Sequence, residues 1–521
     1  MPVDRRYPKI APLGRSGVEH ASLGLGGVIV SAMVLAGCTV GPDYHRPAVD
    51  VPAQFKEAAA GWKTAQPNDQ AARGPWWEVF NDTTLNALES RVNLDNQTVA
   101  GYAAAYQQSR ALVSEAQAAY FPTLGLTASQ ARSKSSTASF SNGNTQAGTQ
   151  GVGGGINNQY SAGLDASWEP DLWGKIRRQV AFEKATAQGA AATLANAQLS
   201  AQGTLAQDYF QLRELDAVQK LLDSTALAYQ KSLELTQYRY MQGVAARSDV
   251  ITAQTQLQQA QAAAIDNGIA RAQYEHAIAV LVGQPASTFA IPAMPLSATP
   301  PVLPLQLPSA LLERRPDVAV AERQAAAANE QIGVAIAAFF PSLTLSASGG
   351  FESSTFSNWL TAPARFWTVG PQLAATLFDG GLRLAQTAAA RATYDQNVAN
   401  YRGTVLAAFQ DVEDNLASLR ILEKEVVLDQ AAADSADQAL AIVTNQYKAG
   451  TGTYLEVIVA QATDYSTHKQ LVNVCGSRMV AAVGLIKALG GGWDASDLDT
   501  AGTKTAGVYS SSPSAVAQKA N

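Results

Sequence analysis

The 521-residue sequence predicts an α+β membrane protein that contains two internal structural repeats. Three observations lead to this prediction: long tracts without proline, four short segments of alternating polarity, and the recurrence of the same features in both halves. Proline breaks helix interiors, so proline-free tracts rich in Ala, Gln, Leu and Glu are typical of long helices. Such tracts cover residues 171–284 and 372–512.

The N-terminus has the pattern of a bacterial lipoprotein signal. A basic leader precedes an apolar stretch over residues 21–36, and Leu35-Ala36-Gly37-Cys38 follows as a lipobox. We therefore predict a signal peptide over 1–37 and an acylated Cys38 as the mature N-terminus, with an anchor segment over 38–84. The alternative is a chance cysteine after an ordinary signal. Lipoproteins retained at the inner membrane typically carry Asp directly after the cysteine. Thr39 stands there in this chain, which favours the outer membrane.

Composition excludes several classes of protein. The net charge of −6 includes no basic block, which argues against nucleic acid as a partner. Acylation of Cys38 leaves Cys475 without an intrachain partner, so no disulfide is expected. The three histidines of the mature chain show no paired metal-ligand spacing, and no nucleophile motif is present, so we expect no enzyme, no cofactor and no metal. After Cys38 no apolar run approaches the ~18 residues of a spanning helix, so strands must cross the membrane.

The two halves repeat each other. Residues 119–129 match 338–348, each with a helix end, a proline and an alternating segment. Arg239-Tyr240-Met241-Gln242-Gly243 similarly matches Gln446-Tyr447-Lys448-Ala449-Gly450. We expect the first repeat over 85–284, a proline-rich linker over 285–308, the second repeat over 309–490, and a flexible tail over 491–521.

Four segments alternate as strands, at 123–129, 160–169, 342–351 and 366–378. Alternation over about ten residues fits a membrane barrel, and the alternative is a soluble sandwich with one wet face. The polar, water-facing side is predicted to carry Ser161, Asp165, Ser167, Thr344 and Ser346. The lipid-facing side is predicted to carry Leu164, Leu343, Leu345 and Leu373.

The predicted helices have two lengths. Residues 174–240 and 382–447 give helices of about 100 Å, and the segments 85–119, 248–282, 308–339 and 453–489 give helices of about 50 Å. Two short helices stacked end to end would match one long helix in a coiled bundle. Four strands cannot close a barrel, and an open edge in lipid leaves backbone groups unpaired, so the chain must oligomerise. We expect a hollow cylinder that crosses the outer membrane and extends ~100 Å into the periplasm.

Several motifs resemble those of the lipid-anchored, TolC-like (NodT-type) outer-membrane efflux protein family. The motifs are residues 38–47, Pro75-Trp76-Trp77, 168–174, 312–317 and 377–381. The resemblance implies a homotrimer in outer-membrane lipid, with a twelve-stranded β-barrel, four strands per protomer, and a periplasmic α-helical barrel. It also implies a passive exit duct of a tripartite efflux pump. The implied partners are a periplasmic adaptor (membrane fusion) protein and an inner-membrane transporter of the resistance-nodulation-division class.

The resemblance further implies a gate where the helix hairpins turn. Tyr447 and Glu456 match constriction positions, whereas Val459 and Gly452 stand where the family often has an aspartate and an arginine. Tyr240 and Asp249, in the first hairpin turn, are the other gate candidates. The alternative is that Glu456 and Asp249 are solvated helix residues.

Two other functions stay open at this point. One is the outer-membrane channel of type I protein secretion, which the lipobox disfavours. The other is a structural coiled-coil lipoprotein, which would leave the four two-faced strands unexplained. The sequence does not identify the cargo.

Overall fold

A computed structural model describes residues 39–52, 54–57, 75–134, 156–296, 300–301 and 314–493. The predicted signal peptide, Cys38 and the residues after 493 lie outside the described residues, as does most of the second half of the linker. The described chain divides into two compact units. The strand unit contains residues 120–177 and 336–378, and the helical unit contains 42–119, 178–335 and the residues from 379 onward.

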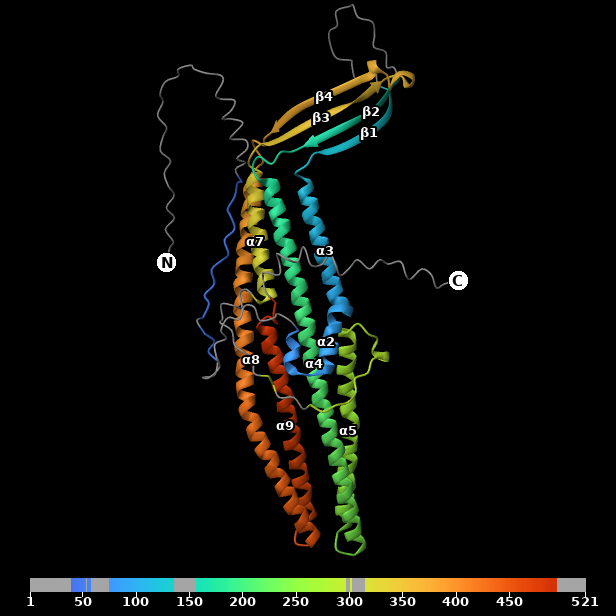
Figure 1. Ribbon diagram of the computed structural model, residues 1–521, viewed down its shortest axis with the longest axis vertical. Helices are drawn as coiled ribbons and strands as arrows, with labels where there is room; N and C mark the ends of the chain where they lie inside the picture. The colour runs from blue at the N-terminus through green and yellow to red at the C-terminus, as the bar shows by residue number, and fades with distance from the viewer. Residues whose placement is uncertain are drawn as a thin grey trace, which may run out of the picture. The chain divides into compact units, whose positions relative to one another are not determined.

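The strand unit is built on one antiparallel sheet in the order β1 (Thr123–Lys134), β2 (Ile156–Trp168), β3 (Ser342–Ser353) and β4 (Arg365–Ala374) (Figure 1). The pairing of β2 with β3 joins the two repeats. The predicted extension of the last strand to Phe378 was wrong. Ala374 pairs with Ser342, the first residue of β3. Because Pro341 comes before Ser342, β3 offers no partner to the residues of the chain after Ala374.

The register confirms the predicted division of the two faces. Ser167 lies opposite Ser346, and Leu343 lies opposite Leu373. Directly paired residues share a face and side chains alternate along each strand. All five predicted polar residues therefore lie on one face of the sheet, and all four predicted leucines lie on the other.

The two long helices and two of the short ones, α5 and α9, have the predicted lengths. They are α2 (Thr83–Asp95), α3 (Gln97–Ala118), α4 (Lys175–Met241), α5 (Arg247–Leu281), α7 (Pro316–Ala337), α8 (Leu382–Ala449) and α9 (Tyr454–Ala488). At 67 and 68 residues, α4 and α8 are each about 100 Å long. The single helix predicted over 85–119 was wrong, because Asn96 adopts an extended conformation and its side chain caps α3 through the Val99 amide. Pro316 begins α7, a position that suits its missing N–H.

The short helices stack end to end, as predicted. The Asn96 side chain donates to the carbonyl of Leu281, which joins the start of α3 to the end of α5 (2.9 Å). In the second repeat, Arg315 donates to the carbonyl of Ala488 (3.3 Å), which joins the start of α7 to the end of α9. Each junction contains a glycine with positive φ, Gly283 in the first and Gly490 in the second. At both glycines the backbone of the neighbouring segment leaves no room for a Cβ atom.

The helical unit has one main hydrophobic core, to which both repeats contribute. Fully buried Tyr209, Phe210 and Tyr401 are among its largest members. By length and composition α9 is apolar enough to cross a membrane, so the prediction that no such run follows Cys38 was wrong. Its residues Met479 and Val483 are completely buried in this core, which accounts for the apolar composition of the helix.

Polar contacts hold the N-terminal segment against the helices. Asp43 pairs with Arg178 (3.0 Å), and the Tyr44 hydroxyl donates to Glu322 (2.7 Å). Further along, the backbone amides of Lys56 and Glu57 donate to the carboxylate of Glu413.

Candidate functional site

The gate candidates lie at the turns of the two helix hairpins of the helical unit. The first hairpin joins α4 to α5, and the second joins α8 to α9 (Figure 1). Gly243 and Gly450 have φ of +76° and +80° at these turns, a conformation that favours glycine. The helix ends predicted from the two tyrosine–glycine motifs are therefore confirmed.

Tyr447 lies in a buried contact between the two hairpins. Its side chain is only 3% exposed, and its ring packs 5.5 Å from that of Tyr454. The guanidinium of Arg239, from the first repeat, stacks over the ring of Tyr447 at 4.3 Å and donates to its backbone carbonyl. The Tyr447 hydroxyl donates to Thr236 on α4 (3.3 Å). We call Thr236, Arg239, Tyr447 and Tyr454 the tip cluster.

The two gate candidates of the first hairpin, Tyr240 and Asp249, are less buried than Tyr447. Tyr240 is 45% exposed, although it is the repeat counterpart of Tyr447. Asp249 is half-exposed in the first turn of α5, where the helix dipole favours a negative charge. Burial raises the pKa of Tyr454, and the charge of Asp249 adds to this rise. Asp249 is thus electrostatically coupled to the tip cluster.

Glu456 is exposed and forms a capping box at the start of α9. Its carboxylate accepts a hydrogen bond from the Thr453 amide (2.8 Å), and the Thr453 hydroxyl accepts one from the Glu456 amide (3.4 Å). A capping interaction typically contributes about 0.5–2 kcal/mol. The side chain therefore has a structural role in this turn, and its exposed position leaves its charge available to solvent.

Sequence reasoning missed the part played by Arg239. It was part of the repeated tyrosine–glycine motif, but nothing in the sequence indicated that its partner lies 208 residues away in the other repeat. A cation over an aromatic ring contributes about 0.5–2 kcal/mol, depending on its desolvation.

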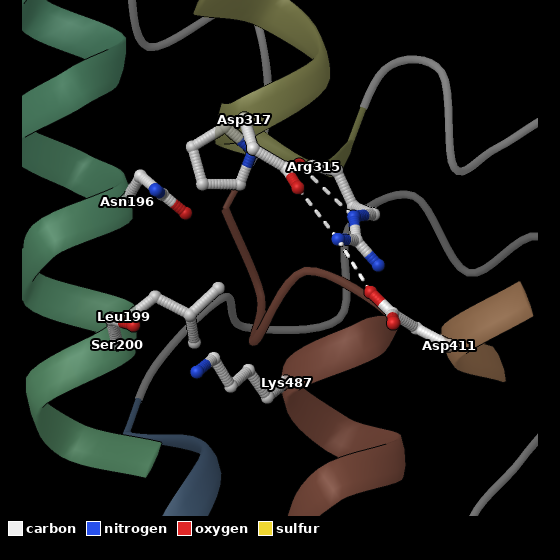
Figure 2. A pocket seen from close by; sticks show the side chains of 8 residues that line it. Asn196, Leu199, Ser200, Arg315, Asp317, Asp411 and Lys487 are labelled. Atoms are coloured by element: carbon white, nitrogen blue, oxygen red, sulfur yellow. Dashed lines mark hydrogen bonds and ion pairs between the residues drawn. The ribbon is translucent and has the colours of Figure 1, made fainter. Parts of the chain in front are cut away.

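A second polar site lies where α7 begins. A cavity of about 260 Å³ is lined by Asn196, Arg315, Asp317, Asp411 and Lys487, among others. Figure 2 shows these side chains around it. The Arg315 guanidinium donates to Asp317 (2.6 Å) and to Asp411 (3.0 Å). These bonds tie α7 to α8, so this arginine of the 312–317 motif acts in packing.

Comparisons with known proteins agree with this architecture. The family model for outer membrane efflux proteins matches residues 88–284 and 307–491. The chain is 30% identical over 470 residues to the probable efflux pump outer membrane protein TtgC of Pseudomonas putida, covering 89% of this chain and 94% of the relative. It is 31% identical over 468 residues to the solvent efflux pump outer membrane protein SrpC of Pseudomonas putida, covering 89% and 97%.

Solved structures show the same fold. The outer-membrane channel OprN superposes with a TM-score of 0.80 at 28% identity, covering 88% of this chain and all of that one. The matched residues include both repeats with their strands and long helices. The chain therefore belongs to the outer membrane efflux protein family and is an outer-membrane efflux channel.

Proposed function

We propose that three copies of this chain form a passive exit duct for small molecules, gated by the tip cluster at the hairpin turns. A periplasmic adaptor and an inner-membrane transporter of the resistance-nodulation-division class would supply the cargo and the energy. The relatives named as efflux pump outer membrane proteins support this role. The anchor is proposed to be an acylated Cys38 in the outer-membrane lipid.

The two-faced sheet supports assembly from several copies. Each protomer contributes four strands, and the outer edges of β1 and β4 have no partner among the described strands. In lipid, unpaired backbone groups cost several kcal/mol each, so these edges must pair with neighbouring copies. Closure into a ring would turn the polar face toward water and the leucines toward lipid.

The observation that carries the gating proposal is the contact of Arg239 with Tyr447 across the two hairpins. It combines stacking with a charge-assisted hydrogen bond, which typically contributes about 1.5–3 kcal/mol. Separation of the hairpin turns must break this contact, so it holds the duct narrow at rest. Binding of the adaptor would open the duct by favouring the separated arrangement.

The acidic residues are proposed to set ion selectivity. Three-fold symmetry would bring three copies of Glu456 near one axis, where like charges attract cations. Asp249, on the other hairpin, would add to this field, and exposed Tyr240 would lie beside it at the turn.

The test is conductance in planar bilayers. Arg239→Gln should raise the conductance several-fold, because it removes the cation from the Tyr447 ring. Arg247→Gln is the matched control, since Arg247 is exposed at the same hairpin turn.

Glu456→Gln should reduce cation selectivity and still fold, because glutamine also completes a capping box. A wide, unselective wild-type pore that neither Arg239→Gln nor Glu456→Gln changes would refute the proposed gate.

A further inference from the structure

Three metal-ligating side chains converge between α8 and α9, away from the tip cluster. Nε2 of His468 lies 3.3 Å from Oδ1 of Asp437 and 3.7 Å from Oδ1 of Asp464. One ligand atom from each of the three residues lies within 4.8 Å of the other two. Asp464 and His468 are one turn apart on the same face of α9, and Asp437 comes from α8.

The two distances from His468 are close to those in the coordination sphere of a small divalent transition metal. Zinc binds imidazole nitrogen and carboxylate oxygen at about 2.0–2.2 Å, so neighbouring ligand atoms in a tetrahedral site lie about 3.3–3.6 Å apart. The two distances from His468 are 3.3 and 3.7 Å and need little adjustment. A pair of ligands at i and i+4 on one helix is a known arrangement for chelating zinc.

The cluster also contains an unsatisfied acceptor. Oδ1 of Asp464 is shielded from solvent and has no hydrogen-bond partner. The carboxylates of Asp464 and Asp437 lie close enough to repel each other. Among the described residues, both pair with His468. A cation placed among the three ligand atoms would relieve this repulsion and satisfy the shielded oxygen.

We propose that Asp437, Asp464 and His468 bind one divalent transition-metal ion per chain and thereby fasten α8 to α9. Imidazole and carboxylate ligands suit Zn²⁺, Co²⁺ and Cu²⁺ better than Ca²⁺ or Mg²⁺, which prefer all-oxygen sites. Three protein ligands leave a fourth position for water. The site lies about 15 Å along α9 from Tyr454, on the hairpin that carries Tyr447 and Glu456.

Histidine spacing in the sequence gives no sign of this cluster. His468 is the single histidine of the cluster, and its carboxylate partners include one on a different helix. The proposal goes beyond the duct function and does not depend on it, because its test measures metal binding and not transport.

The experiment is a titration of the full-length protein, purified in detergent without a polyhistidine tag and stripped with a chelator. Calorimetry with Zn²⁺ should give one ion per chain with a Kd in the micromolar range or below. His468→Gln and Asp437→Asn should each weaken binding at least tenfold. Asp437 is 58% exposed, so its variant keeps the packing intact. His276→Gln is the matched control, because His276 is exposed on α5 and belongs to no such cluster within the part of the chain that the structure describes.

Spectroscopy identifies the ligands independently of affinity. The paramagnetic resonance spectrum of bound Cu²⁺ should show coupling to one imidazole nitrogen, and His468→Gln should abolish it while His276→Gln leaves it unchanged. Failure of the wild-type protein to bind Zn²⁺, or binding that survives both His468→Gln and Asp437→Asn, would overturn the proposal.

Discussion

At the scale of single residues, Glu89 is the least expected feature of the helical core. It is completely buried on α2 beside Leu85 and Val92, and neither of its carboxylate oxygens has a hydrogen-bond partner. Burial raises the pKa of Glu89 to about 9. The side chain is therefore neutral in the folded protein at pH 7, whereas in the unfolded chain it is ionised.

This difference makes stability depend on pH. Between the ordinary value of 4.5 and about 9, the folded state binds more protons at Glu89 than the unfolded state. The free energy of unfolding should therefore fall as the pH rises through this range. Glu89→Gln, which mimics the neutral form, should flatten this dependence and raise the thermal midpoint at pH 8.5 relative to wild type.

Thermal unfolding followed by circular dichroism at pH 5 and pH 8.5 measures the effect. The matched control is Glu115→Gln, because Glu115 is exposed on the neighbouring helix α3. Equal pH dependence in wild type and Glu89→Gln would show that Glu89 does not titrate as its burial indicates.

At the scale of elements, the contact of β2 with β3 is the joint between the repeats in the strand unit. Gly350 on β3 faces Gly163 on β2, and a Cβ at Gly350 would lie only 2.1 Å from the carbonyl oxygen of Ala162. The strands can approach to normal pairing distance only because this position has no side chain.

Gly350→Ala should therefore weaken the sheet. Overpacking against backbone typically costs about 1–3 kcal/mol. The temperature at which the folded form is lost in heat-modifiable gel migration should fall. Gly370→Ala on β4 is the matched control, because a Cβ there meets nothing within 4 Å. Equal temperatures for the two variants would mean that β2 can shift to admit the methyl group.

The two faces of β3 should also differ in their tolerance of charge. Leu345 lies on the apolar face, and Ser346, its neighbour in sequence, lies on the polar face. An arginine on the lipid face costs about 2–4 kcal/mol at the bilayer midplane, whereas a water-facing arginine costs little. Refolding into lipid vesicles should therefore be impaired for Leu345→Arg and near normal for Ser346→Arg. Similar yields for both would argue against the assigned faces.

At the scale of the whole molecule, the sheet requires several copies, and we predict three. A four-stranded sheet with two open edges is incomplete in lipid. The matches to the family model and to OprN cover both repeats, which supply these strands. Native mass spectrometry of the purified protein should give three copies per particle. A monomer that inserts into bilayers and conducts ions would contradict the trimer.

The lipid anchor should be separable from this assembly. The mature N-terminus should be an acylated Cys38, as read by mass spectrometry of the N-terminal peptide. Cys38→Ser should remove the acyl chains yet leave the trimer intact, because the strand edges and not the lipid close the ring. Loss of the trimer in Cys38→Ser would show that the anchor is needed for assembly.

The sequence alone predicted those features that contiguous residues encode. Proline-free tracts predicted α4 and α8 to within a few residues, because a helix needs only local bonds and the absence of a breaker. Alternation predicted both faces of the sheet, since the side-chain period in a strand is two. The glycines after Tyr240 and Tyr447 predicted both hairpin turns, because the left-handed conformation favours glycine.

The tertiary structure decided which of these residues meet. Tyr240 and Tyr447 occupy equivalent positions in the repeats, yet Arg239 covers one and leaves the other exposed. Asp437 joins Asp464 and His468 only because α8 folds back along α9. Such contacts depend on the rotation and offset of packed helices, which residues far apart in the sequence determine together. The sequence therefore determined the elements and their faces, and packing between distant segments determined the tip cluster and the metal-ligating cluster.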